Sequence, residues 1–209
     1  MQGKILCMYS GGLDSAGSLW SILCDPKYAG YQVHVHHIHN INHENRAQIE
    51  SIVVEHTLPV FERLSGRSFI FSQNRIDFSC LPFPSNIPFD TDIFAFMSGN
   101  LAAIDPAIQY VAIGRTRDDV IGGGINTANQ ILRARDTFNL LKGTESQATY
   151  LLPVEHMSKQ QIWDMLPHEI REKTWSCRRP VYETINGQPC IRPCQSCKSC
   201  VSRNALVSK

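Results

Sequence analysis

The segment Ser10-Gly11-Gly12-Leu13-Asp14-Ser15 constrains the fold of this chain more than any other part of its sequence. It directly follows the short apolar run Lys4–Tyr9, which is typical of a buried strand. After it, apolar residues recur at the spacing of a helix, at Ala16, Leu19, Trp20 and Leu23. A strand, a glycine-rich turn and a helix in this order predict the first unit of a parallel, doubly wound sheet.

The same alternation continues to about residue 166. We expect further strands at 31–41, 68–72, 110–113 and 151–154. Helices are expected around 49–58, 94–104, 131–141 and 158–166, and Pro59 should kink or end the first of these. Strands alternating with helices predict the α/β class, with a mostly parallel, Rossmann-like sheet covered on both faces. We expect two parts, an ATP-binding domain over 1–173 and a small metal-binding subdomain over 174–209.

The glycine-rich segment has the composition of a phosphate site. Glycines let the backbone approach phosphate oxygens, and free N–H groups at a helix start attract negative charge. Ser10 and Ser15 can add hydroxyl donors, and Asp14 can hold Mg²⁺. An ordinary turn with Asp14 as helix cap is the alternative interpretation. The chain has no G-x-x-x-x-G-K-[ST] motif and no G-x-G-x-x-G after the strand, which argues against P-loop kinases, GTPases and nicotinamide enzymes.

Cysteines crowd into the end of the chain, where five of the eight lie at or after position 177. Cys194-x-x-Cys197-x-x-Cys200 brings three thiols together and Cys177 can supply a fourth, which predicts a tetrahedral structural Zn²⁺ site. A ferredoxin-like iron–sulfur run would need a further Cys and Pro after Cys200, which are missing. The radical-enzyme spacing that starts at Cys190 lies at the wrong end of the chain.

The overall charge and hydropathy bear on nucleic-acid and membrane partners. Lys plus Arg (20) nearly balances Asp plus Glu (19), so no strong field indicates a nucleic-acid partner. No apolar run reaches the roughly 20 residues of a membrane helix, and the N-terminus does not resemble a signal peptide. We therefore expect a cytoplasmic protein without membrane contact, in which the cysteines serve a metal rather than disulfides.

The segment SGGLDS resembles the pyrophosphatase loop of the ATP-pyrophosphatase superfamily. This resemblance implies that ATP binds on the loop and that AMP passes to a substrate oxygen with release of pyrophosphate. Asp14, Ser10 and Ser15 would act in the chemistry. The ATP contacts implied are Tyr9, Ser10, Gly11, Gly12, Leu13, Asp14, Ser15 and Gly114.

Loop and cysteines together look like the 7-cyano-7-deazaguanine synthase family. Arg203-Asn204 after the last cysteine, Thr174-Trp-Ser-Cys177 and Lys159-x-x-Ile162 all resemble that family's pattern. The resemblance implies a ligase that uses ATP, Mg²⁺ and Zn²⁺ to adenylate 7-carboxy-7-deazaguanine. Ammonia then gives the amide, and a second ATP gives the nitrile. The candidate substrate contacts are Arg46, His43, Phe94 and Asp119.

Substrate-side segments depart from the family, since Pro-Gly-Arg-Asn near 92–95 and Tyr-Pro-Asp-Cys-Arg after Asp119 are absent. One alternative is therefore a paralogue that stops at the amide or couples the activated acid to another amine, on a small molecule or a protein. A tRNA-modifying enzyme of the superfamily and a non-catalytic metal module are two others, and a homodimer is possible. For thiolation, only Cys7 and Cys80 lie where a catalytic thiol would be needed.

Two further segments carry expectations. Alternation along the strand places His34 and His36 on one face of the sheet and His37 and His39 on the other, near the substrate pocket or, less favoured, around a second metal. The run Gly122–Gly124 is interpreted as a mobile loop over the site.

Overall fold

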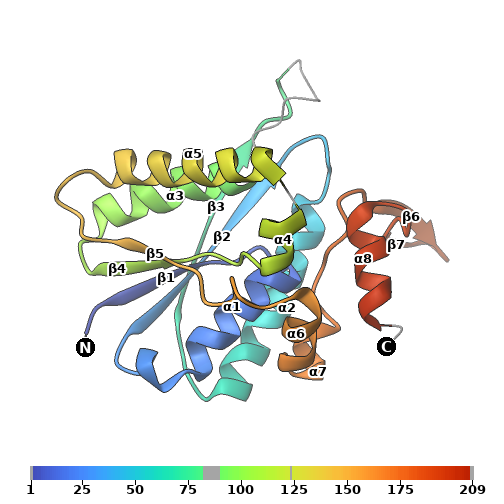
Figure 1. Cartoon of the computed structure of the whole chain (residues 1–209). Helices are drawn as coiled ribbons and strands as arrows, with labels where there is room; N and C mark the ends of the chain where they lie inside the picture. Colours follow the sequence, from blue (N-terminus) through green and yellow to red (C-terminus); the bar gives the residue numbers. More distant parts are fainter. Residues whose placement is uncertain (1, 82–89, 123, 208–209) are drawn as a thin grey trace.

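The computed structural model describes residues 2–81, 90–122 and 124–207 (Figure 1). Its centre is a five-stranded sheet in the order β3-β2-β1-β4-β5, in which every neighbouring pair is parallel. The strands are β1 (Lys4–Met8), β2 (Gln32–Ile41), β3 (Ile70–Asp77), β4 (Ile108–Ala112) and β5 (Thr149–Leu151). From β1 the chain adds β2 and β3 on one side of the sheet and β4 and β5 on the other. The carboxyl ends of β1 and β4 therefore form the switch point where ligands bind in such sheets.

Helices cover both faces of the sheet, as the sequence predicts (Figure 1). Alternate residues of β1 serve two cores, because Ile5 and Cys7 pack toward one face and Leu6 and Met8 toward the other. The first core includes α1 (Leu13–Cys24), α2 (Ala47–Ser65), α6 (Lys159–Met165) and α7 (His168–Arg171). The second includes α3 (Asp90–Ile104) and α5 (Gly124–Lys142). The short helices η1 (Pro26–Tyr28) and α4 (Arg117–Gly122) complete this part of the fold.

Several element boundaries differ from the sequence expectation. Helix α2 does not end at Pro59 but continues to Ser65, where Gly66 closes it in the left-handed conformation (φ 69°). Strand β3 continues to Asp77; it is an edge strand in which Gln73, Arg75 and Asp77 are exposed, so apolar periodicity does not mark its second half. Gly122 is the last residue of α4 and Gly124 the first of α5, so the predicted mobile loop is wrong for these two residues. Gly123 lies outside the described residues.

The C-terminal part is a small unit beside α2 and α6 (Figure 1). It consists of an antiparallel hairpin, β6 (Val181–Ile185) and β7 (Gln188–Arg192), followed by α8 (Lys198–Val207). Asn186 and Gly187 both have positive φ (51° and 76°), as a two-residue hairpin turn requires. The division of the chain at residue 173 stays a prediction. None of the helices in the described ranges combines the length and apolarity needed to cross a membrane.

Candidate active site and metal cluster

The phosphate loop lies between the end of β1 and the start of α1. Gly11 has φ 77°, and a Cβ on it would come within 2.9 Å of Val53 on α2, so a side chain is excluded for two reasons. Ser15 Oγ donates to the Gly12 carbonyl (3.0 Å) and lies 3.1 Å from Ser10 Oγ. The two hydroxyls therefore brace the loop. No side chain caps α1 at Gly12, which leaves the first helical N–H groups for an anion.

Gly114 follows β4 and reaches the loop across the switch point. A Cβ on Gly114 would come within 2.5 Å of the backbone of Asp14 and Ser15, a distance that no side chain tolerates. On the other side, the backbone N–H of Trp175 donates to the Gly11 carbonyl (2.9 Å). The loop is thus enclosed by Gly114 and Trp175, which are distant from it in the chain. Gly114 was predicted as an ATP contact, and the structure brings it to the loop.

Asp14 and Asp119 share the ammonium of Lys159. Lys159 Nζ lies 2.8 Å from Asp14 Oδ2 and 3.1 Å from Asp119 Oδ1. Burial lowers the pKa of Lys159, but the two carboxylates outweigh burial, so the net pKa is raised and the side chain is charged. Asp119 is itself held by the N–H and hydroxyl of Thr116, at 3.1 and 2.8 Å. Asp119 therefore lies at the phosphate loop.

Lys159 is a functional candidate to which the sequence reasoning assigned no role. The sequence does predict that Lys159 begins a helix, because Ser158 and Gln161 match a capping box, which the structure forms at the start of α6. The pairing with Asp14 spans 145 residues and no local pattern contains it.

The residues around Asp14 fit a divalent cation and a nucleotide phosphate. Asp14 Oδ1 is buried and has no hydrogen-bond partner among the described residues, which is the state expected of a ligand oxygen without its ion. Burial raises the pKa of Asp14, with Lys159 opposing, so a cation would strongly favour the charged form. Carboxylate oxygens beside a helix start match the usual partners of Mg²⁺ and phosphate.

Arg46 lies at the start of α2, where its guanidinium is divided among three carboxylates. Nε donates to Glu44, Nη1 to Glu50 and Nη2 to Asp90. Arg178, directly after Cys177, also donates to Glu44 (2.8 Å) and to Asp90 (3.3 Å). These five residues are called the arginine–carboxylate cluster below. That Arg46 binds a substrate carboxylate stays a prediction, and in this arrangement its donors are already engaged.

The other predicted substrate contacts, His43 and Phe94, come from different parts of the chain. His43 is exposed, and its Nε2 is 3.5 Å from the Leu81 carbonyl. Phe94 is half-buried and packs on the second core from α3. Their substrate roles stay predictions.

The histidines of β2 alternate as predicted and are held by hydroxyl groups. His34 and His36 both bond Ser72 Oγ at 2.7 Å on one face. On the other face, His39 Nδ1 donates to Ser51 Oγ (2.7 Å) and Ser51 lies 3.0 Å from His37 Nε2. His37 Nδ1 then donates to the Tyr9 carbonyl (3.0 Å), just before the phosphate loop. Burial lowers the pKa of His37 to about 4, so it is neutral.

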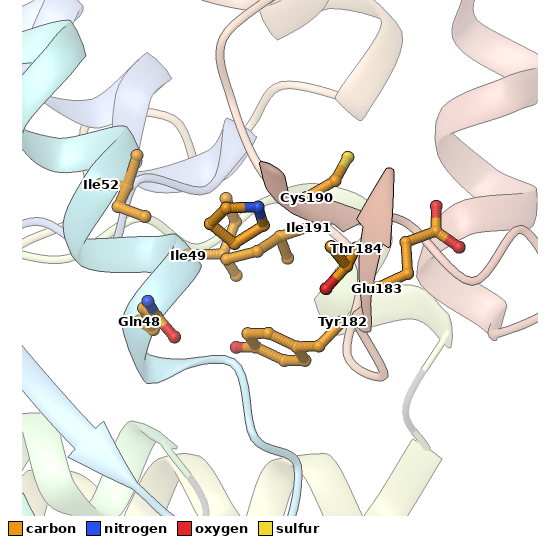
Figure 2. A pocket seen from close by; sticks show the side chains of 9 residues that line it. Gln48, Ile49, Ile52, Tyr182, Glu183, Thr184, Cys190 and Ile191 are labelled. Carbon is orange, nitrogen blue, oxygen red and sulfur yellow. The ribbon is translucent and has the colours of Figure 1, made fainter. Parts of the chain in front are cut away.

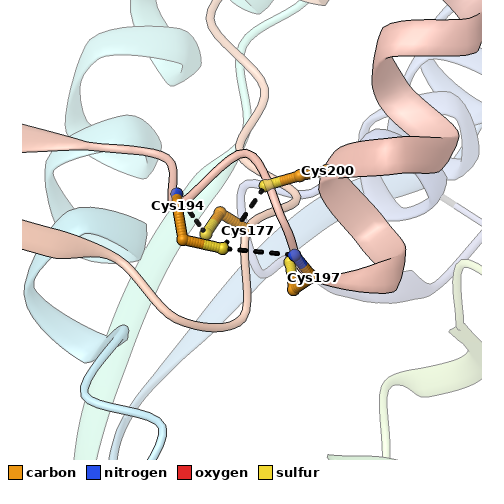
Figure 3. A group of neighbouring side chains, drawn as sticks. All are labelled: Cys177, Cys194, Cys197 and Cys200. Atoms are coloured by element: carbon orange, nitrogen blue, oxygen red, sulfur yellow. Dashed lines mark hydrogen bonds between the residues drawn. The ribbon is translucent and has the colours of Figure 1, made fainter.

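Four thiols converge between β7 and α8 (Figure 3). The Sγ atoms of Cys177, Cys194, Cys197 and Cys200 all lie within 4.8 Å of one another. Thiolates bound to one zinc at the usual Zn–S length of about 2.3 Å stand roughly 3.8 Å apart. Backbone N–H groups of Cys194 and Cys197 already donate to neighbouring sulfurs, at 3.3 Å each. The cluster therefore fits a tetrahedral zinc site.

A groove separates α2 from the β6–β7 hairpin, with a volume of about 560 Å³ (Figure 2). Tyr182 lies across it, and its hydroxyl donates to the Asn45 carbonyl (2.7 Å). The lining is mostly apolar and comprises Gln48, Ile49, Ile52, Tyr182, Glu183, Thr184, Pro189, Cys190 and Ile191. Cys190, outside the four-thiol cluster, belongs to this groove.

Comparison with known proteins agrees with this architecture. Residues 4–208 match the family model described as "Queuosine biosynthesis protein QueC". The chain is also similar to a 7-cyano-7-deazaguanine synthase from Campylobacter jejuni subsp. doylei, with 26% identity over 224 residues. That alignment covers 97% of this chain and 92% of the relative. Because the family model spans nearly the whole sequence, including the phosphate loop and all four clustered cysteines, the chain belongs to the QueC family.

Proposed function

We propose that the protein is an ATP-dependent ligase that adenylates a 7-deazaguanine carboxylate, 7-carboxy-7-deazaguanine, and joins it to ammonia. The family and the name of the C. jejuni relative support an enzyme of 7-cyano-7-deazaguanine synthesis. The observation that carries ATP chemistry is the uncapped phosphate loop beside the Asp14–Lys159–Asp119 arrangement.

Different groups of the loop have different roles in phosphate activation. The free N–H groups at the start of α1 bind phosphate oxygens, and the glycines keep the backbone close to them. Mg²⁺, held by Asp14 and Asp119, would neutralise charge on the phosphates. Lys159 then moves from the two carboxylates to the pyrophosphate that leaves, because its ammonium prefers the more highly charged partner.

The four thiolates would hold Zn²⁺ in a structural role, since all four tetrahedral positions are taken by protein. Trp175 connects this unit to the loop by its bond to Gly11. Zinc binding therefore orders a segment that forms one wall of the ATP site.

The further course of the reaction is the finer part of the proposal. The amide would be dehydrated to the nitrile with a second ATP. Transfer of the activated acid to another amine, on a small molecule or a protein, is the alternative. For a tRNA thiolase, Cys7 is a poor catalytic thiol, because burial raises its pKa to about 12 and keeps it protonated.

The experiment is incubation of the protein with ATP, Mg²⁺, 7-carboxy-7-deazaguanine and ammonium, with mass spectrometry of all products. AMP, pyrophosphate and the amide or nitrile are expected. ADP and phosphate would contradict the proposal. A reaction that consumes ATP only when a different amine is supplied would favour the alternative.

A further inference from the structure

Arg203, on α8, binds the backbone of the segment that follows α7. Its Nη1 donates to the Thr174 carbonyl (2.6 Å) and to the Thr174 hydroxyl (2.8 Å). Its Nη2 donates to the carbonyls of Arg171 and Glu172, at 3.3 Å each. A guanidinium beside the end of a helix often does no more than satisfy the last carbonyls of that helix. The contact with Thr174 has a further effect.

The carbonyl of Thr174 and the N–H of Trp175 belong to one peptide unit. Arg203 binds the oxygen end of this unit, and the nitrogen end donates to the Gly11 carbonyl of the phosphate loop (2.9 Å). A peptide unit is planar and rigid, so a displacement at one end is carried to the other. A charged donor on the oxygen also polarises the unit and strengthens the bond that its N–H donates. Arg203 therefore acts on Gly11 through a single peptide plane.

The same guanidinium contacts α6, the helix that carries Lys159. Its Cζ lies 5.2 Å from the centre of the Trp163 ring, a distance typical of a cation–π contact. Trp163 is buried in the first core. Lys159 and Trp163 are four residues apart on α6, so they lie on the same face of this helix. Arg203 thus contacts both the segment that holds Gly11 and the helix that presents Lys159 to Asp14.

Arg203 is also linked to the four-thiol cluster, because Cys200 lies one turn before it on α8 (Figure 3). Cys200 is buried, and its Sγ lies within 4.8 Å of the other three. A zinc ion held by the four thiolates would fix Cys200 and with it the first turns of α8, because binding of a structural zinc is itself folding free energy. The place of Arg203 therefore depends on the metal.

We propose that Arg203 is a positioning residue of the ATP site, which couples binding of zinc by the four cysteines to binding of ATP at the phosphate loop. This role rests on the proposed function, because it requires that the loop binds ATP. Such coupling is reciprocal. If zinc tightens the binding of ATP by some factor, ATP must tighten the binding of zinc by the same factor.

The test uses this reciprocity in the unaltered protein and in Arg203→Met, which keeps an apolar stem beside Trp163 but has no donor. Zinc affinity is measured by equilibrium competition with a chromophoric chelator, with and without Mg²⁺ and α,β-methylene-ATP, which cannot be cleaved between its α- and β-phosphates. We expect the analogue to tighten zinc binding by about tenfold in the unaltered protein and by less than about twofold in Arg203→Met. Calorimetry on the zinc-loaded proteins should show about tenfold weaker binding of the analogue in Arg203→Met.

Arg192→Met is the matched control, because it removes a guanidinium from the same small unit, where Arg192 donates to Glu183 (2.6 Å). It should keep the full coupling, and it corrects for zinc bound by the analogue itself. Thr174→Val supplies the test if circular dichroism shows that Arg203→Met does not fold. It removes only the hydroxyl acceptor of Arg203, and the coupling should fall by about threefold.

Full coupling in Arg203→Met, or in Thr174→Val where that variant is used, would overturn the inference and leave Arg203 as a clamp on the end of α7. Coupling that is kept in Arg203→Met but lost in Arg178→Met would place the route in the arginine–carboxylate cluster instead. Absence of coupling in an unaltered protein that binds the analogue would also overturn the inference. Failure of the zinc-loaded, unaltered protein to bind the analogue is a different result, and it would reject the proposed function itself.

Discussion

Lys159 and Asp14 form an ion pair across the phosphate loop, with Nζ 2.8 Å from Oδ2, although 145 residues separate them in the chain. Both side chains are at most about a third exposed, and the ammonium also faces Asp119 at 3.1 Å. In the proposed function, a cation that arrives with ATP would compete for the same carboxylates. The pair is therefore the part of the site expected to rearrange when nucleotide binds.

Lys159→Met should lower the rate of pyrophosphate release by on the order of 100-fold or more, because one charge that stabilises the leaving phosphates is lost. Lys159→Arg should restore part of the rate. Lys173→Met, an exposed change elsewhere, serves as the control. A near-normal rate in Lys159→Met would remove Lys159 from the mechanism.

Asp14→Ala should remove most turnover by a different route, since it deletes the orphaned oxygen that fits Mg²⁺. The loss should be on the order of a thousandfold at saturating Mg²⁺. Titration of Mg²⁺ measures it, because a variant limited by metal binding needs more Mg²⁺ for half its maximal rate. An unchanged Mg²⁺ requirement together with full activity would contradict the assignment.

Gly114→Ala should weaken ATP binding at least tenfold, because its Cβ would stand 2.5 Å from the backbone of Asp14 and Ser15 and push the loop away. Calorimetric titration with ATP measures the affinity. Thermal unfolding, run in parallel, distinguishes a displaced loop from a protein that no longer folds.

The purified protein should contain about one zinc per chain, measured by elemental analysis. Replacement of Cys194 by Ser should abolish zinc binding and loosen the hairpin and α8, because binding of a structural zinc is itself folding free energy. Cys190→Ser should keep its zinc, since Cys190 lies outside the four-thiol cluster. Iron with a visible absorption band would indicate an iron–sulfur cluster instead.

His37 should make the protein less stable in mild acid. Its folded-state pKa is about 4, below the ordinary value of 6.5, so the unfolded chain binds the proton more tightly. The contribution of His37 is complete above pH 6.5 and is lost as the pH falls toward 4, by at most about 3 kcal/mol. Chemical denaturation of the unaltered protein and His37→Asn between pH 4 and 7 measures it. Parallel curves for both proteins would show that another group titrates.

The sequence predicted the strands of a parallel sheet and the glycine-rich phosphate loop because both depend on local patterns. Apolar runs mark β1 and β4, and the six residues from Ser10 to Ser15 contain their own turn and helix start. The spacing of Cys194, Cys197 and Cys200 likewise predicted a shared metal site. Cys177, more distant in the chain, was predicted as the fourth ligand. The Asn186-Gly187 dipeptide is also a local signal, since this pair is typical of a two-residue hairpin turn.

Long-range pairings could not be predicted in the same way. No local pattern shows that Arg46 meets Asp90, that Lys159 meets Asp14, or that Glu50 lies under Gly11. The predicted range of β3 ended too early, at residue 72, because hydrophobic periodicity is lost on an exposed edge of the sheet. In each case the information lies in tertiary packing rather than in neighbouring residues.

The hydrogen bond from Trp175 to Gly11 also has a consequence for synthesis of the protein. The loop leaves the ribosome before Gly114, Lys159 and Trp175, which enclose it and follow much later in the chain. At ordinary translation rates the interval is on the order of 10 s. During that time β1 also lacks β4, its neighbour on one side. A nascent chain therefore cannot complete the surroundings of its phosphate loop until Trp175 has been made.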